Sequence, residues 1–307
     1  MDGRCAQVQP MLVIMNPRSG MKLGAKNLCD ILSILQSGGY LPTVLLTEKS
    51  GDAARFVRDY GKNAAMIVCI GGDGTLNEVV TGMVEAGLTQ PIGYLPAGST
   101  NDFAGSLGLS RDLLTAARDV VSGRAAAYDV GSFDGRCFTY VASFGAFTRS
   151  SYSTPQDIKN ALGHVAYILS GIYDLARIVA FPMRVETDTQ VFEGEYIFGA
   201  ISNSTSIGGM LHYDPEIVDL NDGLLEVLLI RVPANPAELA QLLYALSAQA
   251  FDESDCIQFV STTRVKVETR AEVDWSLDGE YEKGRRQVCI RNLRDAIRVI
   301  VPNRENA

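Results

Sequence analysis

The chain has 307 residues, 47% hydrophobic and 21% charged, which is the balance of a globular protein long enough for two domains. Its formal net charge of −9 argues against nucleic-acid binding. It also excludes a broad basic surface as the main contact with anionic lipid, although a local basic patch could still bind such lipid. No apolar run reaches the roughly 18 residues of a membrane span and no signal-peptide pattern is present, so we expect a cytoplasmic protein.

Strands and helices alternate through residues 1–127. Short apolar runs predict strands at 11–16, 42–47, 64–70 and 91–96. Helical spacing of apolar residues predicts helices at 25–37, at 50–60 with Ser50 as its cap, from Thr75 onward, and at 107–121. Because the strands are apolar throughout and alternate with helices, we expect a doubly wound α/β domain built on a parallel sheet.

Four polar loops follow these strands. They are NPRSG (16–20), TEKSGD (47–52), GGDGT (71–75) and PAGSTND (96–102). Turn chemistry alone explains any one glycine-rich loop. In a parallel sheet, however, all four leave the carboxyl edge, where ligands bind, so together they predict a binding site.

The loop at 71–75 has the features of a phosphate site. Its glycines lack Cβ atoms, so main-chain amides can approach an anion closely and adopt positive φ. Thr75 and Glu78 form the capping-box pattern T-x-x-E, which predicts a helix N-terminus at Thr75. Asp73 would repel a phosphate unless a cation or a proton lies between them, so it is a magnesium ligand, a general base or only a helix cap. The loop is neither a Walker A motif nor a GxGxxG fingerprint.

The pattern after residue 127 is that of a β-rich domain. Residues 128–133 and 136–142 flank Asp134-Gly135 and predict a hairpin with a two-residue turn. Further strands are expected at 184–202, 224–232, 256–269, 273–280 and 286–292, with helical interruptions at 157–179 and 236–249. Many short strands separated by turns favour a β-sandwich.

GGDGTLNEV (71–79), with NPRSG (16–20) before it and LPAGSTNDFA (95–104) after it, resembles the catalytic domain of diacylglycerol kinases and of their bacterial, sphingosine and ceramide kinase relatives. NAD kinases share GGDGT, and the GSTNDFA segment favours the lipid branch. Ser99 stands where the family has threonine and keeps the hydroxyl. The resemblance implies an NAD kinase/diacylglycerol kinase-like α/β domain at 1–127 with a C-terminal return at 294–307, a β-sandwich domain at 128–293, and a nucleotide cleft between them.

The resemblance also implies the reaction and the nucleotide site. It implies an ATP-dependent lipid kinase that uses Mg²⁺ and phosphorylates a lipid hydroxyl, with diacylglycerol as the expected acceptor and phosphatidic acid as the product. The expected nucleotide-binding residues are Asn16, Thr47, Gly71, Gly72, Asp73, Gly74, Thr75, Asn77, Glu78, Gly98, Ser99, Asn101 and Asp102.

Two motifs of the second half carry family roles, although a tight turn alone explains either of them. The acid of SLDGEYEKG (276–284) is taken as the general base, which gives Glu280, with Asp278 beside it and Asp73 as the third catalytic candidate. DLNDGLLEV (219–227) holds a structural Mg²⁺ in bacterial members. Carried over, its ligands are the Asp222 side chain and the carbonyls of Asp219 and Leu224.

Several alternatives stay open. They are an NAD kinase-like or other small-molecule kinase, and a nucleotide-binding regulator without activity, which would not need the acids that this chain keeps. The lipid would be met peripherally at the membrane surface, where the apolar segment 157–181 is a candidate contact, although an apolar helix more often packs on a sheet. Basic residues lie around it at Arg149, Lys159, Arg177 and Arg184. The identity of the lipid and homodimerisation stay undecided.

Overall fold

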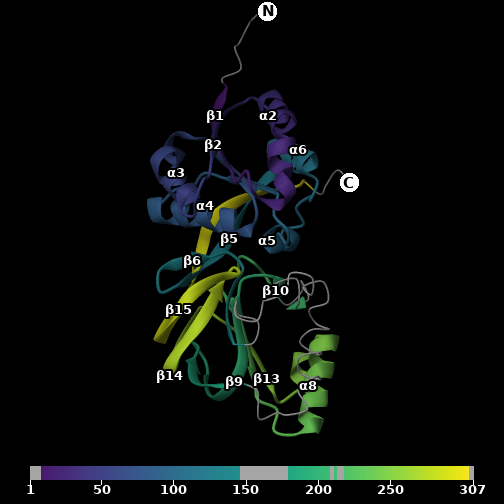
Figure 1. Ribbon diagram of the computed structural model, residues 1–307, viewed down its shortest axis with the longest axis vertical. Coiled ribbons are helices and arrows are strands. Elements are labelled where there is room, and N and C mark those ends of the chain that lie inside the picture. Colours follow the sequence, from purple (N-terminus) through teal and green to yellow (C-terminus); the bar gives the residue numbers. More distant parts are fainter. Residues whose placement is uncertain (1–7, 146–178, 208–210, 213–217, 304–307) are drawn as a thin grey trace, which may run out of the picture. The chain divides into compact units, whose positions relative to one another are not determined.

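The computed structural model describes residues 8–145, 179–207, 211–212 and 218–303 (Figure 1). The chain divides into two compact units, Met1–Tyr128 with Asp295–Ala307, and Asp129–Arg294. The sequence predicted boundaries after residues 127 and 293, and each lies one residue before the boundary between the two units in the structure. Of the apolar segment 157–181 only the last three positions are described, and Arg149, Lys159 and Arg177 lie outside the described residues.

The first unit is built on a parallel sheet with the strand order β2-β1-β3-β4. Its strands are β1 (Gln9–Met15), β2 (Tyr40–Leu46), β3 (Met66–Gly71) and β4 (Ile92–Pro96). The end of β15 (Glu280–Val301) pairs in parallel with β4, with Val299 opposite Ile92, so the C-terminal segment joins this sheet.

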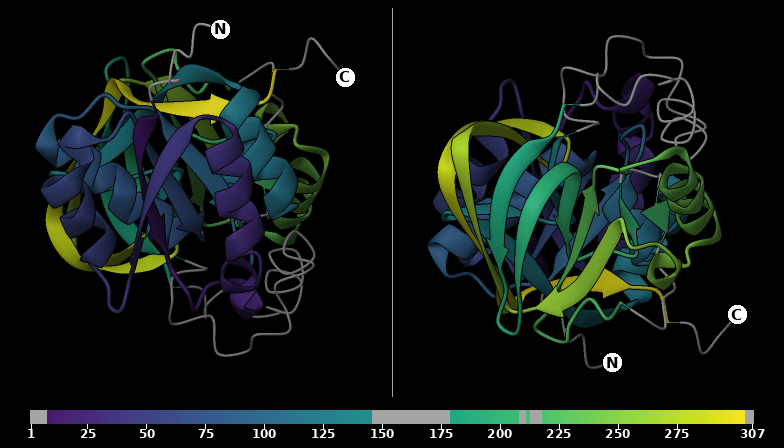
Figure 2. Two further views of the ribbon diagram at one scale, coloured as in Figure 1. Left: turned by 90° about the horizontal axis from the view of Figure 1, so that it is seen from above. Right: turned by 90° about the horizontal axis from the view of Figure 1, so that it is seen from below.

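Helices cover both faces of this sheet, as the left view of Figure 2 shows. They are α1 (Leu23–Lys26), α2 (Leu28–Ser37), α3 (Asp52–Tyr60), α4 (Asp73–Ala86), α5 (Asp102–Ser106) and α6 (Leu113–Ser122), with short 3-10 turns at Gly20–Lys22 and Gly61–Asn63. On one face α2 and α6 pack over Met11, Val13 and Met15. On the other, α3 and α4 cross so closely that a Cβ at Gly82 would lie 2.7 Å from the Ala54 carbonyl oxygen.

The helix expected at 107–121 is wrong at its start. The chain forms α5 and then a separate α6, because the Asp112 carboxylate accepts a hydrogen bond from the Thr115 amide (2.8 Å) and caps a new helix there. The helix expected from residue 25 is likewise broken at Asn27, between α1 and α2.

The second unit is almost entirely β. Its strands are β5 (Arg124–Phe133), β6 (Arg136–Phe138), β7 (Val141–Gly145), β8 (Phe181–Glu186), β9 (Val191–Ser202), β10 (Ser206–Ile207), β11 (Leu211–His212), β12 (Leu225–Arg231), β13 (Ile257–Thr262), β14 (Arg264–Leu277) and most of β15. One apolar cluster, centred on Trp275, draws buried side chains from eight of these strands (β5 to β9, β12, β14 and β15). A second cluster packs α8 (Pro236–Ala248) on the opposite face of β12, visible at the right of Figure 2.

Turns divide several strands that the sequence predicted as continuous. Residues 184–202 form β8 and β9 because the Thr187 amide donates to the Gln190 carbonyl (2.9 Å) and closes a turn. The hairpin at Asp134-Gly135 is confirmed, with Phe133 opposite Arg136 and positive φ at both turn residues. The same geometry at Asp278 (φ 49°) and Gly279 (φ 81°) joins β14 to β15.

Candidate functional site

The four polar loops of the first unit lie at one edge of its sheet. The register sets Met15 beside Leu46 and Ile70, and Gly71 beside Pro96, so all four strands end at the same level. The chain leaves β1 toward α2 on one face and leaves β3 toward α4 on the other. Such a reversal between neighbouring parallel strands is the place where doubly wound sheets bind ligands.

Asn16 ties the loop after β1 to the loop after β3. Its amide donates to the Ile70 carbonyl (2.9 Å), and its side-chain Nδ2 reaches Thr75 Oγ1 (3.4 Å). Its Oδ1 accepts from the Arg18 amide (2.9 Å), which shapes the following turn. Asn16 is therefore a structural link within the site.

Glycines let three of these loops touch through their main chains. A Cβ on Gly98 would lie 2.6 Å from the Gly72 Cα, and one on Gly20 would lie 2.1 Å from the Ala97 carbonyl oxygen. The expectation of positive φ at the glycines of 71–74 is wrong, because Gly72 has φ −92° and the others are also absent from the left-handed region. A Cβ on Gly72 would lie 3.1 Å from the Gly98 Cα of the neighbouring loop, and one on Gly71 would lie 2.6 Å from the Thr75 Cβ, so these two glycines are required for lack of space.

The capping box predicted at Thr75 is also wrong. Helix α4 begins two residues earlier, at Asp73, with Gly72 as its N-cap, so Thr75 lies buried in the first turn. The Glu78 carboxylate turns instead to the start of α3, where it accepts from the amides of Gly51 (2.7 Å) and Ala53 (3.1 Å). Glu78 thus supplies the cap expected from Ser50, whose hydroxyl also donates to it (3.1 Å).

Asp73 and Asp102 lie at the starts of two helices that meet. The Asp73 Oδ2 atom accepts a hydrogen bond from the Asp102 amide at 3.2 Å, and Asp102 is buried in the first turn of α5. Asn101 has the left-handed backbone conformation. Its side-chain Oδ1 accepts from the Gly98 amide (2.9 Å), and its Nδ2 donates to the Gly98 carbonyl (3.0 Å). The two acids are therefore held at the same edge as the glycine contacts.

The remaining predicted residues differ in exposure. Thr47 is buried and its amide donates to the Met15 carbonyl (2.9 Å), Asn77 is half-buried, and Ser99 is exposed.

Sequence reasoning missed Asp52, the last residue of the TEKSGD loop. Hydrogen bonds from the Glu48 amide, the Arg55 side chain and the Lys49 amide lower the pKa of Asp52 from 3.8 to about 2.

Asp52 gives a testable dependence of stability on pH. Its pKa is lower in the folded protein than in the unfolded chain, so its stabilising effect is complete above about pH 4 and disappears as the pH falls toward 2. We expect Asp52→Asn to unfold at a lower temperature than the parent protein at pH 7, with the gap narrowing toward pH 3. Thermal unfolding at both values measures this, and a gap independent of pH would contradict it.

In the second unit, Asp278 is an anchor of the turn between β14 and β15. Its buried carboxylate accepts from the Thr139 amide and hydroxyl (2.6 and 2.8 Å) and from the amides of Tyr140 and Val141 (3.0 Å each). Burial raises the pKa of Asp278, while these hydrogen bonds oppose that rise. Its acceptor capacity is used to hold residues 139–141.

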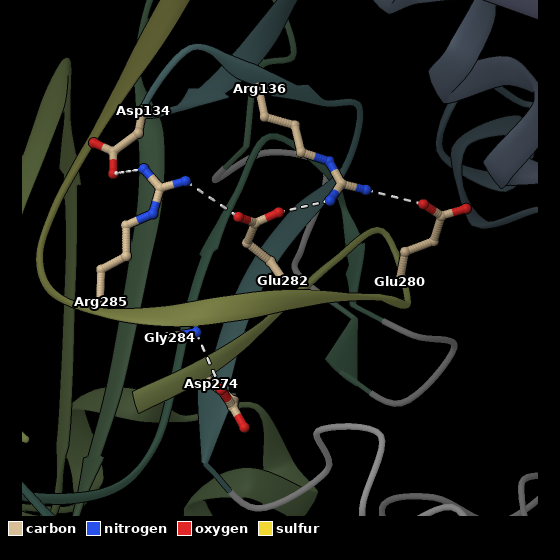
Figure 3. Close-up of polar contacts among 7 residues, drawn as sticks. All are labelled: Asp134, Arg136, Asp274, Glu280, Glu282, Gly284 and Arg285. Carbon is tan, nitrogen blue, oxygen red and sulfur yellow. Dashed lines mark hydrogen bonds and ion pairs between the residues drawn. The ribbon is translucent and has the colours of Figure 1, made fainter. Parts of the chain in front are cut away.

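Glu280, by contrast, is exposed and belongs to a ladder of alternating charges (Figure 3). Arg136 bonds to Glu280 Oε2 (2.9 Å) and to Glu282 Oε2 (2.6 Å). Arg285 continues the ladder from Glu282 (3.4 Å) to Asp134 (2.8 Å). Sequence reasoning missed Arg136, although its place directly after the Asp134-Gly135 turn was a usable signal.

The predicted metal-binding residues come together in one loop before β12. Asp219 Oδ1 accepts from the Asn221 amide (3.0 Å) and Asp222 Oδ1 from the Leu224 amide (2.8 Å). The buried Asp129 carboxylate receives the Gly223 amide (2.7 Å), which fixes the loop. No group of three His, Cys, Asp or Glu side chains suited to a metal occurs within the described residues, so a cation here would depend on main-chain oxygens as well.

Glu226 is a further acid that sequence reasoning missed. It is only 1% exposed although it lies in the apolar strand β12. Burial, and then the charges of Asp222 and Asp219, raise the pKa of Glu226 to about 8. A charged residue inside an apolar strand, two positions after Leu224, was the available signal.

In the described parts of the chain, no helix is long and apolar enough to cross a membrane.

Comparison with known proteins identifies the family. Residues 10–133 match the model of the diacylglycerol kinase catalytic domain, and residues 140–301 match the YegS C-terminal NAD kinase beta sandwich-like domain. A diacylglycerol kinase of Staphylococcus saprophyticus subsp. saprophyticus is 31% identical over 292 residues, covering 95% of each chain. A diacylglycerol kinase of Bacillus subtilis (strain 168) is 33% identical over 272 residues, covering 88% of this chain and 89% of the relative.

A crystal structure of a protein from Bacillus anthracis str. Sterne shares the fold. It aligns with a TM-score of 0.80 at 24% identity and covers 100% of this chain and 99% of that one. The chain therefore belongs to the diacylglycerol kinase catalytic-domain family. The predicted resemblance and the predicted fold class, a doubly wound α/β domain followed by a β-sandwich domain, are confirmed.

Proposed function

We propose that this protein is an ATP-dependent lipid kinase that transfers the γ-phosphoryl group of ATP to the hydroxyl of diacylglycerol and so forms phosphatidic acid. Membership of the family supports the enzyme class. The observation that carries the assignment to this chain is the side-chain-free contact of Gly20, Gly72 and Gly98 with their neighbouring loops, at the carboxyl edge of the sheet.

The cradle formed by these glycine loops suits the phosphates of ATP. Main-chain amides of residues 71–75 begin the 14-residue helix α4, whose N-terminal dipole favours an anion. A Cβ at Gly20 or Gly98 would collide with backbone atoms, so no bulkier loop could keep this shape. Asn16, Thr47, Asn77 and Ser99 are proposed to line the nucleotide pocket around it, as are the Glu78 and Asn101 side chains through the loops that they hold.

Asp73 and Asp102 fit the needs of a catalytic Mg²⁺. The two acids lie at helix starts that are joined by the bond from the Asp102 amide to the Asp73 carboxylate, and Mg²⁺ takes few protein oxygens because phosphate and water supply the rest. When bound, the ion would neutralise charge on the β- and γ-phosphates. Asp73 is the residue proposed to hold it, and Asp102 orients Asp73 through its amide.

Glu280 is the proposed general base. Arg136 bonds to one of its two carboxylate oxygens, which leaves the second to accept the proton of the lipid hydroxyl. The hydroxyl oxygen then bonds to the γ-phosphorus as the bond to ADP breaks. Asp278 takes a positioning role here, since it fixes the turn from which Glu280 projects.

The loop Asp219–Leu224 is proposed to hold a second, structural Mg²⁺. Its donor set consists of the Asp222 carboxylate and the carbonyls of Asp219 and Leu224, and Mg²⁺ prefers oxygen ligands of this kind. The Leu224 carbonyl also accepts from Asn292 Nδ2 (2.7 Å), which a carbonyl with two lone pairs permits. We further propose that the lipid is met from the membrane surface.

The direct test is an acceptor screen. The purified chain is incubated with ATP labelled at the γ-position, Mg²⁺ and vesicles that contain diacylglycerol, sphingosine, ceramide or monoacylglycerol, and in parallel with NAD. We expect labelled phosphatidic acid from the diacylglycerol vesicles. Label in NADP, or in none of the lipids, would contradict the proposal.

Arg136 should act on the rate through Glu280. An exposed ion pair is worth at most about 1 kcal/mol, so Arg136→Ala is expected to lower kcat about fivefold and to leave the KM for ATP unchanged. Arg136→Lys should recover most of that rate, because it keeps the charge. Arg285→Ala, which breaks the far end of the same ladder, is the matched control. Equal kcat values for Arg136→Ala and Arg285→Ala would remove Arg136 from this role.

A further inference from the structure

Glu226 lies beneath the loop Asp219–Leu224. Side chains alternate along β12, so Glu226 shares the face of Leu228 and Ile230, while Leu225 and Val227 belong to the Trp275 cluster on the other face. Leu228 and Ile230 pack in one cluster with Val218 and Leu220 of the loop. The buried Glu226 carboxyl therefore faces the underside of the loop.

Oxygen atoms without partners occur at Glu226, at Ser202 opposite it, and at two asparagines whose NH₂ groups bond to main-chain carbonyls of the loop. Among the described residues, buried side-chain oxygens that lack a hydrogen-bond partner include Glu226 Oε2, Ser202 Oγ, Asn203 Oδ1 and Asn292 Oδ1. Ser202 lies directly opposite Glu226 in the pairing of β9 with β12. Buried polar atoms are almost always paired in proteins, so this group of oxygens requires a physical account.

The two asparagines are held with their oxygens free to accept. Asn203 Nδ2 donates to the carbonyls of Asp129 (2.9 Å) and Leu220 (3.3 Å), and Asn292 Nδ2 donates to the Leu224 carbonyl (2.7 Å). Asn292 Nδ2 also donates to the Asp129 carboxylate (3.1 Å), so both NH₂ groups are committed to oxygen acceptors and cannot exchange places with the side-chain oxygens. The atoms without partners are thus three acceptor oxygens and one hydroxyl, Ser202 Oγ, which can donate to only one of them, so the others call for a further donor or a cation.

The charges favour a cation. No ion pair involves Glu226, Asp219 or Asp222 among the described residues. The methylene chain of Arg294 passes beside Gly223, 3.4 Å from the position of a Cβ there.

We propose that Glu226 is a further anionic ligand of the Mg²⁺ held by the loop Asp219–Leu224, with the oxygens of Ser202 and Asn203 lining the site beneath it. Mg²⁺ binds oxygen donors, and a buried carboxylate is stable when it is paired with a cation. The inference rests on the proposed structural magnesium site and does not depend on the kinase activity.

Thermal unfolding of the full chain in Mg²⁺ alone, without nucleotide, tests the proposal. In the absence of Mg²⁺, Glu226→Gln should unfold at a higher temperature than the parent, because it removes a buried acid that has no partner. Added Mg²⁺ should raise the unfolding temperature of the parent, while Glu226→Gln should need about tenfold more Mg²⁺ or more for the same shift. Glu268→Gln, whose carboxylate pairs with Lys266 at 2.7 Å, is the matched control and should respond like the parent.

Two results would overturn the proposal. One is an identical Mg²⁺ dependence for Glu226→Gln and the parent, and the other is a parent protein whose unfolding does not respond to Mg²⁺. Hydrogen exchange of the parent supplies an independent reading, in which Mg²⁺ should protect the amides of residues 218–226, and unchanged exchange there would also reject it. Asp73→Ala should keep the Mg²⁺ response of the unfolding temperature, because Asp73 belongs to the proposed catalytic site and not to this loop. A failed Mg²⁺ response would therefore reject the role of Glu226 without rejecting the proposed kinase activity.

Discussion

Asp73→Ala is expected to abolish phosphoryl transfer, with kcat lower by about a thousandfold or more. Charge neutralisation and positioning dominate this reaction, so the loss of a group that holds the metal removes much of the catalytic effect. The carboxylate also accepts the Asp102 amide at 3.2 Å, and the variant therefore loses the orientation of α5 as well. Initial rates with saturating ATP and diacylglycerol vesicles measure the change.

The control for Asp73 is Asp59→Ala in the same unit. Asp59 is an exposed residue of α3 that pairs with Arg55 at 3.9 Å, so its loss should leave the rate unchanged. Unfolding temperatures of both variants separate a catalytic defect from a folding defect. Activity of Asp73→Ala within a few fold of Asp59→Ala would reject the metal role of Asp73.

Glu280→Gln is expected to lower kcat about a hundredfold to ten-thousandfold, which is the usual contribution of a general base. The amide keeps the size of the side chain and can still contact Arg136, but it cannot take the proton of the lipid hydroxyl. The Kd of ATP, measured by titration calorimetry, should not change, because the base acts on the acceptor and not on the nucleotide.

Glu282→Gln is the matched control for Glu280. It makes the same chemical change two residues away and removes the negative charge that pairs with the same arginine, which lies 2.6 Å from Glu282 (Figure 3). If the structural ladder alone mattered, both variants would be slowed alike. Equal rates for Glu280→Gln and Glu282→Gln would therefore exclude the general-base role.

Much of the first unit could be predicted because its strands are short apolar runs whose burial is nearly complete. β3, for example, is buried at all six positions, and the sequence places it within two residues at its start. Once the strands are placed, the sequence also shows which loops follow their carboxyl ends and so lie at the edge of the sheet. The errors at the sheet edge came from partners distant in the sequence: Glu78 caps a helix 25 to 28 residues earlier, and the Gly72 and Gly98 main chains touch each other.

In the second unit, neighbouring acids turned out to have opposite surroundings. Asp278 and Glu280 are two residues apart, yet one is buried against residues 139–141 and the other is exposed beside Arg136. A turn motif reveals that a bend occurs but not which side chain it buries, because that depends on strands more than a hundred residues away. The burial of Glu226 likewise depends on another strand, since β9 places Ser202 opposite it.

The measurement that tests the central claim most directly is a crystal structure of the protein with a non-hydrolysable Mg²⁺–ATP analogue. The account predicts the triphosphate against the amides of residues 71–75 and beside the loop at 16–20, with the metal near Asp73. A triphosphate bound elsewhere, or a cradle that stays empty at saturating nucleotide, would contradict it.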